Sequence, residues 1–195
     1  MFPGFDNVFR FSQNHSNRSF HADLIGDETT GEALLRGEWV PKTTLPAHWA
    51  MGKAEPLDIA WGRHTAWYYI SPKVLQLFKQ HGITGWSTYP IELHNKAGEV
   101  YPGYAGLSIT GRCGPIDEQG GEVEPGQKEG KKFIRRCGLF FDESTWDGSD
   151  FFCPEGENTY MFATARVKHL LDENNICGLV FTPLAETTWI SRPHK

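Results

Sequence analysis

Carboxylates and aromatic side chains are concentrated in residues 142–152. Three of these carboxylates and a distant histidine could hold a divalent metal, or share acid and base work, if a pocket set their pKa values apart. These candidates are Asp142, Asp147, Asp150 and His94. Their spacing does not fit the calcium loop of an EF-hand. We favour a structural interpretation, a tight turn whose aspartates accept bonds from backbone amides, and keep a metal-dependent hydrolase as an alternative.

The four cysteines form only half of a zinc-binding pattern. A structural zinc site takes two thiolates from each C-x-x-C knuckle, because both then reach adjacent corners of a tetrahedron. Cys113 and Cys137 each precede a glycine, but neither has a second cysteine three residues earlier. Cys153 and a histidine such as His94 could complete a four-ligand site, so a zinc-stabilised interaction module is a second alternative. We expect instead reduced thiols, no bound metal and no cofactor.

The other catalytic motifs of the chain are incomplete. Pro125 stands where a phosphate-binding loop that ends at Gly130 and Lys131 needs a glycine. Ser108 is not followed by the glycine that a nucleophile elbow requires two residues later. None of the eight histidines lies three or four residues from another, which excludes the helical zinc-protease pattern. We therefore predict that the protein is not an enzyme.

An internal repeat at a constant offset of 93 residues organises the chain. Residues 70–92 match residues 163–185 without a gap. Two amphipathic helices share apolar spacing in any case, but shared glycine and proline after the helix need another explanation, which we take to be duplication. The identical pairs are Val74 and Val167, Leu77 and Leu170, Ile83 and Ile176, Gly85 and Gly178, and Pro90 and Pro183.

Each copy predicts a strand, a helix and a second strand. Ser71 and Thr164 stand where a hydroxyl caps a helix, and a glycine or asparagine ends each helix. In the first copy the second strand is expected to stop at Pro90. A helix of this length between two strands suits a parallel crossover. We expect two such units, about 67–90 and 160–183, in one mixed-sheet body of the α+β or α/β class.

The chain length of 195 residues fits a single domain, 1–195. Within it we expect one pseudo-repeat at about 40–112 and a second at about 133–190. Residues 114–132 hold five glycines, two prolines, five acids and three lysines. Such a segment buries little apolar area, so we interpret it as an exposed, mobile loop.

Charge and hydropathy limit the partners. The formal net charge is −5, and no run of lysine and arginine is longer than two residues. A nucleic-acid binder needs a basic stripe that displaces counterions from phosphates, so nucleic acid is not an expected partner. No apolar run approaches the roughly 18 residues of a membrane span, and the first residues lack the features of a signal peptide. We expect a cytoplasmic protein without a membrane partner.

Several short segments occur in an order that resembles one bacterial family. They lie at residues 109–117, 138–142, 146–152, 164–168 and 179–184, and the third reads W-D-G-S-D-F-F. In this order they resemble the immunity proteins of polymorphic and contact-delivered toxin systems. The similarity is greatest to the myxobacterial double-CxxCG immunity family and its relatives with a W-D-G-S-D signature, over about residues 64 to 186. Thr110 and Ile134 occupy places where that family has cysteines, so a family zinc knuckle is not expected.

The resemblance implies a cytoplasmic bacterial protein that protects its producer by binding one cognate protein toxin, without catalytic residues. A toxin that acts on nucleic acid or a nucleotide is well blocked by an acidic surface, which imitates the anionic substrate and speeds encounter. We expect a monomer or homodimer. The expected partner-binding residues are Asp117, Glu118, Glu122, Glu124, Asp142, Glu143, Trp146 and Asp147.

Overall fold

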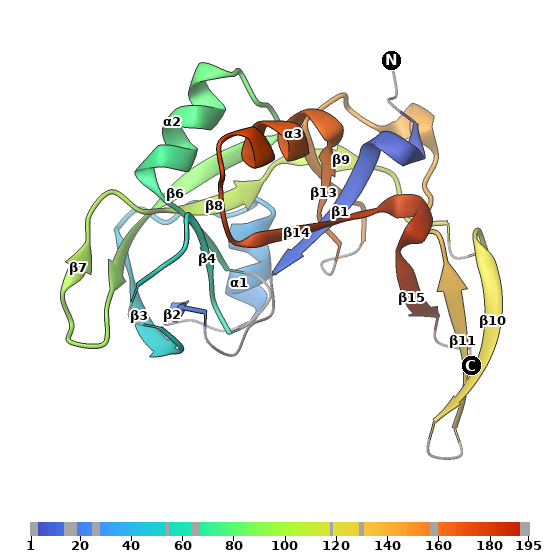
Figure 1. Ribbon diagram of the computed structural model, residues 1–195, viewed down its shortest axis with the longest axis horizontal. Coiled ribbons are helices and arrows are strands. Elements are labelled where there is room, and N and C mark those ends of the chain that lie inside the picture. The colour runs from blue at the N-terminus through green and yellow to red at the C-terminus, as the bar shows by residue number, and fades with distance from the viewer. Residues whose placement is uncertain are drawn as a thin grey trace.

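The computed structural model describes residues 4–13, 19–24, 28–53, 55–63, 67–117, 119–128, 131–156 and 160–191 (Figure 1). It is a mixed α+β fold built mostly from strands, which confirms the α+β class predicted from the sequence. Three α-helices lie in these ranges, α1 (Glu28–Leu35), α2 (Pro72–Gln80) and α3 (Ala165–Glu173). Three short 3-10 helices accompany them, η1 (Phe5–Asn7), η2 (Glu143–Thr145) and η3 (Leu184–Glu186).

The largest sheet has seven strands in the order β3-β2-β4-β5-β8-β6-β7. Because β3 also pairs with β6, six of these strands close into a barrel, and β7 pairs with β6 outside it. The strands are β2 (His21–Leu24), β3 (Leu45–Met51), β4 (Ile59–Trp61), β5 (Tyr68–Ile70), β6 (Trp86–His94), β7 (Val100–Tyr101) and β8 (Ala105–Ile109).

Two further sheets complete the fold, so the strands do not form the one mixed sheet that we expected. The five-stranded sheet has the order β14-β1-β13-β12-β9, and the three-stranded sheet has the order β10-β11-β15. The latter extends from the body as an arm (Figure 1). The strands are β1 (Val8–Gln13), β9 (Gly111–Cys113), β10 (Glu122–Lys128), β11 (Lys131–Cys137), β12 (Phe151–Pro154), β13 (Phe162–Thr164), β14 (Leu179–Pro183) and β15 (Thr188–Ser191).

A strand, a helix and a second strand lie in each of the segments 67–90 and 160–183. The strands β5 and β6 both run antiparallel to β8, which lies between them, so they are parallel to each other. In the same way β13 and β14 flank β1. Both segments are therefore split βαβ units with an antiparallel strand inside, and not the direct parallel crossovers suggested by the helix length.

The two helices begin differently. Ser71 caps α2 as predicted, because its Oγ accepts a hydrogen bond from the backbone N of Val74 at 3.3 Å. Thr164 holds the same position before α3, but its side chain makes no cap bond and lies 3.2 Å from Asp150 Oδ1 instead. The predicted capping bond of Thr164 is therefore wrong: its hydroxyl donates to Asp150 Oδ1 but, unlike that of Ser71, is not placed to accept from a backbone N–H of its helix.

Two expectations, about where a strand ends and about a loop, are also wrong. The strand β6 does not stop at Pro90 but continues to His94. Its pairing passes there from β8, whose last partner is Pro90, to β3, whose first partner is Ile91, and a proline at such a change disturbs the ladder little. Residues 114–132 are not a structureless loop, since they contain β10 and the start of β11. Strand pairing with β15 as the third member orders this segment where buried apolar area would not.

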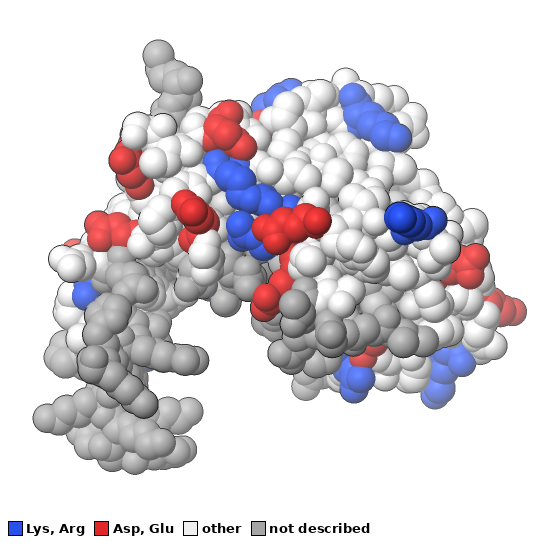
Figure 2. All heavy atoms as spheres, turned by 180° about the vertical axis from the view of Figure 1, so that it is seen from behind, with Lys and Arg blue, Asp and Glu red and all other residues white. Residues whose placement is uncertain are grey.

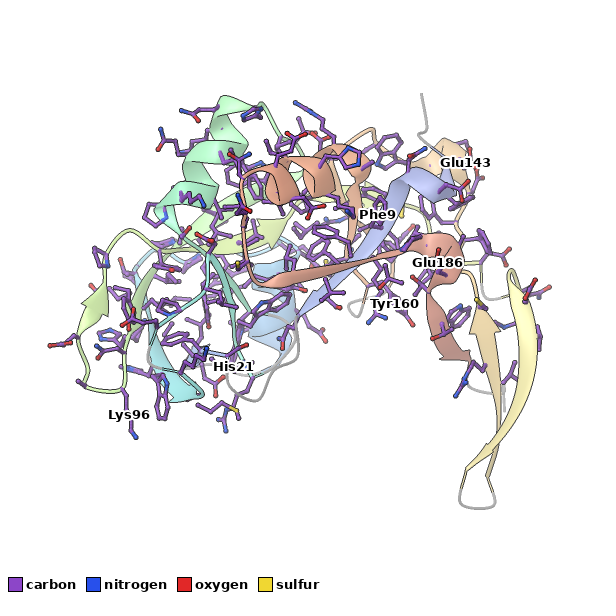
Figure 3. The ribbon with its side chains drawn as sticks, in the orientation of Figure 1. Phe9, His21, Lys96, Glu143, Tyr160 and Glu186 are labelled. Carbon is purple, nitrogen blue, oxygen red and sulfur yellow. The ribbon has the colours of Figure 1, made fainter. Side chains whose placement is uncertain are left out.

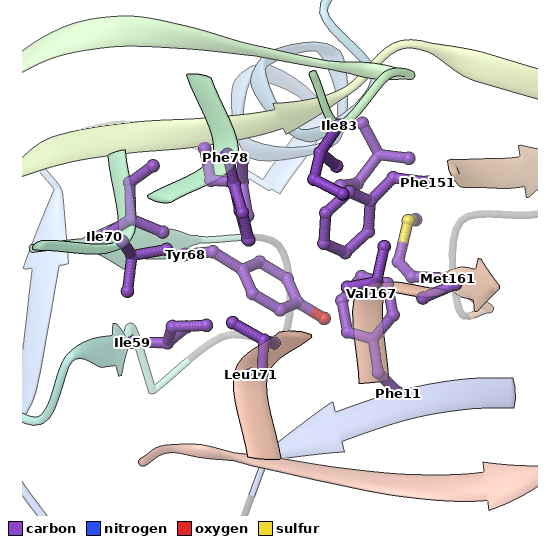
Figure 4. Packing of buried hydrophobic residues seen from close by; sticks show 14 of the residues in the cluster. Phe11, Ile59, Tyr68, Ile70, Phe78, Ile83, Phe151, Met161, Val167 and Leu171 are labelled. Carbon is purple, nitrogen blue, oxygen red and sulfur yellow. The ribbon is translucent and has the colours of Figure 1, made fainter. Parts of the chain in front are cut away.

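Three clusters of buried side chains form the core. The largest lies between the barrel, the five-stranded sheet and helices α2 and α3, and Figure 4 shows Tyr68, Phe78, Phe151 and Leu171 packed within it. The second fills the barrel around Tyr69, and the third lies on the opposite face of the five-stranded sheet. Burying each of these side chains stabilises the fold by about 1.5–3 kcal/mol. The alternation of strand residues between two clusters explains why both faces of the barrel sheet and of the five-stranded sheet are apolar.

Candidate functional site

The acidic segment 142–152 folds as the tight turn that we favoured. Asp142 precedes η2 and accepts bonds from the Oγ and the backbone N of Ser144, at 2.7 and 2.9 Å. These bonds stabilise the carboxylate and lower the pKa of Asp142. Asp147 accepts from the backbone N of Ser149 at 2.9 Å and of Arg112 at 2.7 Å. Asp142 and Asp147 are both exposed.

Trp146 anchors this turn to the core. It is half-buried, its ring packs 5.5 Å from that of Phe152, and its Nε1 donates to the carbonyl of Ser149 at 3.1 Å. The side chain therefore contributes to folding first, and only part of its surface is accessible to a partner. Among the expected partner-binding residues whose side chains are described, Trp146 is the one that packs against the core.

Asp150 has turned inward and is fully engaged by the fold. Its carboxylate accepts from the backbone N and Oγ1 of Thr84, at 2.9 and 3.1 Å, from Thr164 at 3.2 Å and from Arg166 Nη1 at 2.8 Å. The side chain is buried. Its lone pairs are thus committed to joining the segment before β6 to the start of α3, which leaves little capacity for a metal or a substrate.

The four candidate ligands of the hydrolase alternative do not converge. His94 lies on the barrel, where its ring stacks on His48 at 4.8 Å between centroids, whereas Asp150 contacts Thr84 and Asp147 contacts Arg112. Across the described ranges, no group of three or more His, Cys, Asp or Glu side chains is placed to hold a metal ion. The hydrolase alternative therefore has no geometric support, and we do not propose it.

The cysteines are likewise separated. Cys113 and Cys153 lie on the adjacent strands β9 and β12, but their side chains belong to different buried clusters, on opposite faces of the sheet. Cys137 lies on β11 with its Sγ 3.7 Å from the carbonyl of Ala185. Burial raises the pKa of Cys113 to about 12, so it is a protonated thiol at neutral pH. The zinc-stabilised module has no support among the described residues.

Two arginines converge on the buried thiol of Cys153. Arg112 Nη1 and Arg36 Nη1 lie 3.2 and 3.4 Å from its Sγ. Desolvation nevertheless raises the pKa of Cys153, outweighing the opposite effect of the two guanidinium groups. Arg112 also donates to the carbonyls of Ile109, Gly111 and Arg36. The group therefore fastens the end of α1 to β9 and β12, and burial disfavours the thiolate form of Cys153.

An acidic surface surrounds this arginine pair. We call it the β9 face, because most of its charged members contact β9 or a residue bonded to β9. Glu143 belongs to η2, which borders β9, and Trp39 and Val40 follow Glu38 in the chain. Glu38 lies 2.7 Å from Arg36 and 3.8 Å from Arg112, and the backbone N of Glu155 donates to the carbonyl of Cys113. The turn of Asp147 and the helix η2 border the same strand. The β9 face comprises Arg36, Glu38, Trp39, Val40, Arg112, Asp142, Glu143, Asp147 and Glu155.

Apolar side chains lie exposed beside these charges. Trp39 is 42% exposed and Val40 is 59% exposed, directly after Glu38 in the chain. Figure 2 shows a face of the molecule on which acidic side chains surround a smaller group of basic ones. Glu143 lies at the η2 end of the molecule, far from the β6–β7 hairpin that carries Lys96 (Figure 3). Five carboxylates against two guanidinium groups leave the β9 face negative.

The remaining predicted residues are dispersed. Asp117 is exposed and accepts from the backbone N of Gln119, and Glu122 is exposed on β10, at the base of the arm. Glu118 lies outside the described residues. Glu124 belongs to β10 by its backbone, but its side chain lies outside the described part of the structure. The structure thus groups Asp142, Glu143 and Asp147 with residues that we did not predict.

Sequence reasoning missed Glu38, Trp39 and Glu155. Trp39 stands among several tryptophans in the first third of the chain, and nothing in its neighbours separates an exposed ring from a buried one. Its exposure follows from its place after α1, where the chain turns back toward β3. Glu155 approaches β9 only because β12 pairs with that strand in parallel.

No protein family model matches this chain, and no curated protein matches it. Within the described ranges, no helix is both long enough and apolar enough to cross a membrane.

Proposed function

We propose that this protein is a bacterial immunity protein, which binds one cognate toxin in the cytoplasm of the producing cell and neutralises it without catalysing a reaction. The ordered segments between residues 109 and 184 that resemble immunity proteins of polymorphic toxin systems support this class. The observation that carries the proposal is the β9 face, where Glu38 and Asp147 both bind Arg112 and the exposed Trp39 directly follows Glu38 in the chain.

The chemistry of the β9 face suits a basic protein partner. A toxin that cleaves nucleic acid or consumes a nucleotide presents cations to its anionic substrate, and a negative surface attracts the same cations. Asp142 and Asp147 are held in fixed orientations by backbone amides, so they lose little freedom when a partner binds. Trp39 adds the large aromatic surface that anchors many tight interfaces.

The arginine pair sets the orientation of this surface. Arg36 and Arg112 are both bound to Glu38, and Arg36 is held on Cys153. The carboxylate beside Trp39 is therefore fixed relative to β9 and β12. Such pre-organisation raises affinity by reducing the entropy lost on binding. We thus propose that Cys153 helps to hold Arg36, and through it Glu38, in place on the β9 face.

A growth assay tests the proposed function. A gene that adjoins the gene of this protein is tested as the toxin: it is induced in a sensitive host, with and without co-expression of the protein. We expect growth to be restored by the wild-type protein and by Glu173→Lys, a matched change at an exposed residue of α3. The combined variant Trp39→Ala and Glu143→Lys should not restore it. Absence of both rescue and a purified complex would refute the proposal.

A further inference from the structure

The barrel sheet and the five-stranded sheet repeat one arrangement. From β6 through β8, β5 and β4 to β2, neighbouring strands pair antiparallel three times and then in parallel. From β14 through β1, β13 and β12 to β9, the pairings have the same directions in the same order. Each strand of the barrel sheet except β3 and β7 thus has a counterpart in the other sheet.

The register of the pairing is repeated as well. Each residue of β13 and β14 lies 93 positions after its counterpart in β5 and β6, and each residue of β8 lies 96 positions after its counterpart in β1. For example, Tyr69 pairs with Gly106 as Phe162 pairs with Arg10. The same rule holds along β6 and β14, from the first paired residue to the last. Chance pairing does not conserve register, because a one-residue slip turns every side chain to the other face.

Two aspartates repeat one set of hydrogen bonds. Asp58 and Asp150 lie directly before β4 and β12. In each unit, the residue that precedes the helix donates its backbone N–H to the aspartate carbonyl and its hydroxyl to the aspartate Oδ1. The Oδ2 of each aspartate accepts a hydrogen bond from a backbone N–H that lies before the second strand of the other unit. These contacts are Ser71 and Cys177 for Asp58, and Thr164 and Thr84 for Asp150.

The helices α2 and α3 exchange equivalent contacts. Lys73 in the first turn of α2 donates to the carbonyl of Asn174 at the end of α3, at 3.0 Å. Arg166 in the first turn of α3 donates to the carbonyl of His81 at the end of α2. A cation at the last carbonyls of a helix is favourable. The contacts therefore relate the two units by an approximate twofold symmetry.

We infer that residues 1–102 and 103–195 are two intertwined copies of one folding unit, each of which is the binding partner that the other requires. The first strand of each copy lies in the sheet of the other copy: β1 lies between β13 and β14, and β8 lies between β5 and β6. This unit extends beyond the pseudo-repeats 40–112 and 133–190, because it includes β1 and β2 as counterparts of β8 and β9.

Neither copy can complete its sheet alone. Without β8, the strands β5 and β6 lose the partner between them, and the central core loses Leu107 and Ile109. Without β1, β13 and β14 are left apart and Phe11 is missing from the same core. Unpaired backbone groups and a missing core strand are both strongly destabilising.

The two exchanged strands are not interchangeable. The residue of β8 that faces Tyr69 is Gly106, and a Cβ at this position would lie 2.1 Å from the ring of Tyr89. The equivalent residue of β1 is Arg10, whose side chain would overlap the same ring. Therefore β1 cannot take the place of β8, and each slot accepts the strand of the other copy.

A cut between the copies tests the inference. A site for a sequence-specific protease is inserted between Pro102 and Gly103, which are both exposed, and the folded protein is cleaved. We expect the pieces to remain together in native buffer, to unfold in one transition and to separate only in denaturant. Refolded singly, each piece should lack cooperative unfolding, and mixing should restore a 1:1 complex. Separation of the cleaved pieces in native buffer, or cooperative folding of either piece alone as a monomer, would overturn the inference.

Two variants of the second piece locate the contact. Gly106→Ala places a methyl group against Tyr89, so it should weaken association of the pieces at least about tenfold. Glu173 is exposed at the end of α3 in the same piece, so Glu173→Ala should change the dissociation constant by no more than about threefold. Equal effects of the two variants would contradict the proposed place of β8 between β5 and β6.

Discussion

Arg166 lies 2.8 Å from Asp150, and among the described residues of the other unit no ion pair joins the equivalent positions, Lys73 and Asp58. Its counterpart Lys73 donates instead to the carbonyl of Asn174. Asp150 is also buried, whereas Asp58, at the equivalent place, is half-buried and makes longer bonds, of 3.3 and 3.4 Å. Asp58 and Asp150 thus occupy equivalent positions, but the fold depends more on Asp150.

Replacing the two aspartates should therefore have unequal effects. Asp150→Ala removes the buried acceptor of Thr84, Thr164 and Arg166 and leaves the buried Thr164 hydroxyl without it, so we expect a loss of about 3 kcal/mol of unfolding free energy. Asp58→Ala removes longer and more exposed bonds and should lose about 1 kcal/mol. Urea denaturation of the two variants measures both values. A larger loss for Asp58→Ala would contradict the described hydrogen bonding.

The contact between Tyr89 and Gly106 gives a second prediction. The hydroxyl of Tyr89 is buried and has no hydrogen-bond partner among the described residues, so Tyr89→Phe should be neutral or slightly stabilising. Gly106→Ala in the intact chain should lose about 2 kcal/mol through overpacking. Replacing the ring of Tyr89 by a smaller side chain should relieve this overlap. The double variant Tyr89→Leu, Gly106→Ala should therefore lose less unfolding free energy than the sum of the losses of the two single variants. Additive losses in denaturant titrations would refute the contact.

Thiol labelling tests the burial of the cysteines. Cys177 is exposed, while Cys113 and Cys153 are buried and their pKa values are raised by desolvation. Because the thiolate is the reactive form, a higher pKa leaves less of it at pH 8, and burial restricts access further. A maleimide should therefore modify Cys177 first, and Cys113 and Cys153 only after unfolding. Rapid labelling of Cys153 in the Cys177→Ser variant, detected by mass spectrometry, would contradict the described cluster.

The local elements were largely predictable from the sequence. The helices α2 and α3 follow from apolar spacing at Val74, Leu77 and Phe78 and at the matching positions of the second copy, all of which are buried. Ser71 capped as expected. These features depend on neighbours three or four residues away, which a sequence displays directly.

The long-range pairing could not be predicted in this way. The place of β1 between β13 and β14 joins residues more than 140 positions apart, and no local pattern records the choice. The hairpin of β10 and β11 was missed because strand pairing, not hydrophobic alternation, orders it. The candidate site was predicted in part: Asp142, Glu143 and Asp147 are exposed in one turn, but Glu38 approaches Arg112 beside this turn only through the fold.

Trp39 should dominate partner binding if the β9 face is the interface. Trp39→Ala should raise the dissociation constant of the toxin complex about thirtyfold, or about 2 kcal/mol, because Trp39 is 42% exposed in the free protein and offers that aromatic surface to a partner. Val100→Ala, at an exposed side chain of β7, serves as the control and should leave the constant unchanged. Calorimetric titration compares the two. Equal affinities would place the interface elsewhere.

Glu143 should act mainly on the rate of encounter. A rim charge speeds association through long-range attraction, so Glu143→Lys should lower the association rate constant about tenfold at low salt and less at high salt. Glu173→Lys changes the net charge equally on α3, away from the β9 face, and should have a smaller effect. Surface plasmon resonance at two ionic strengths separates these cases. A matching decrease for both variants would indicate net charge rather than the β9 face.

The most direct test of the proposed role is a titration of the purified toxin encoded by the adjoining gene with the purified protein. The account predicts that toxin activity falls in proportion to added protein and reaches zero near one equivalent, with the protein recovered unchanged. Full toxin activity in the presence of several equivalents would contradict it.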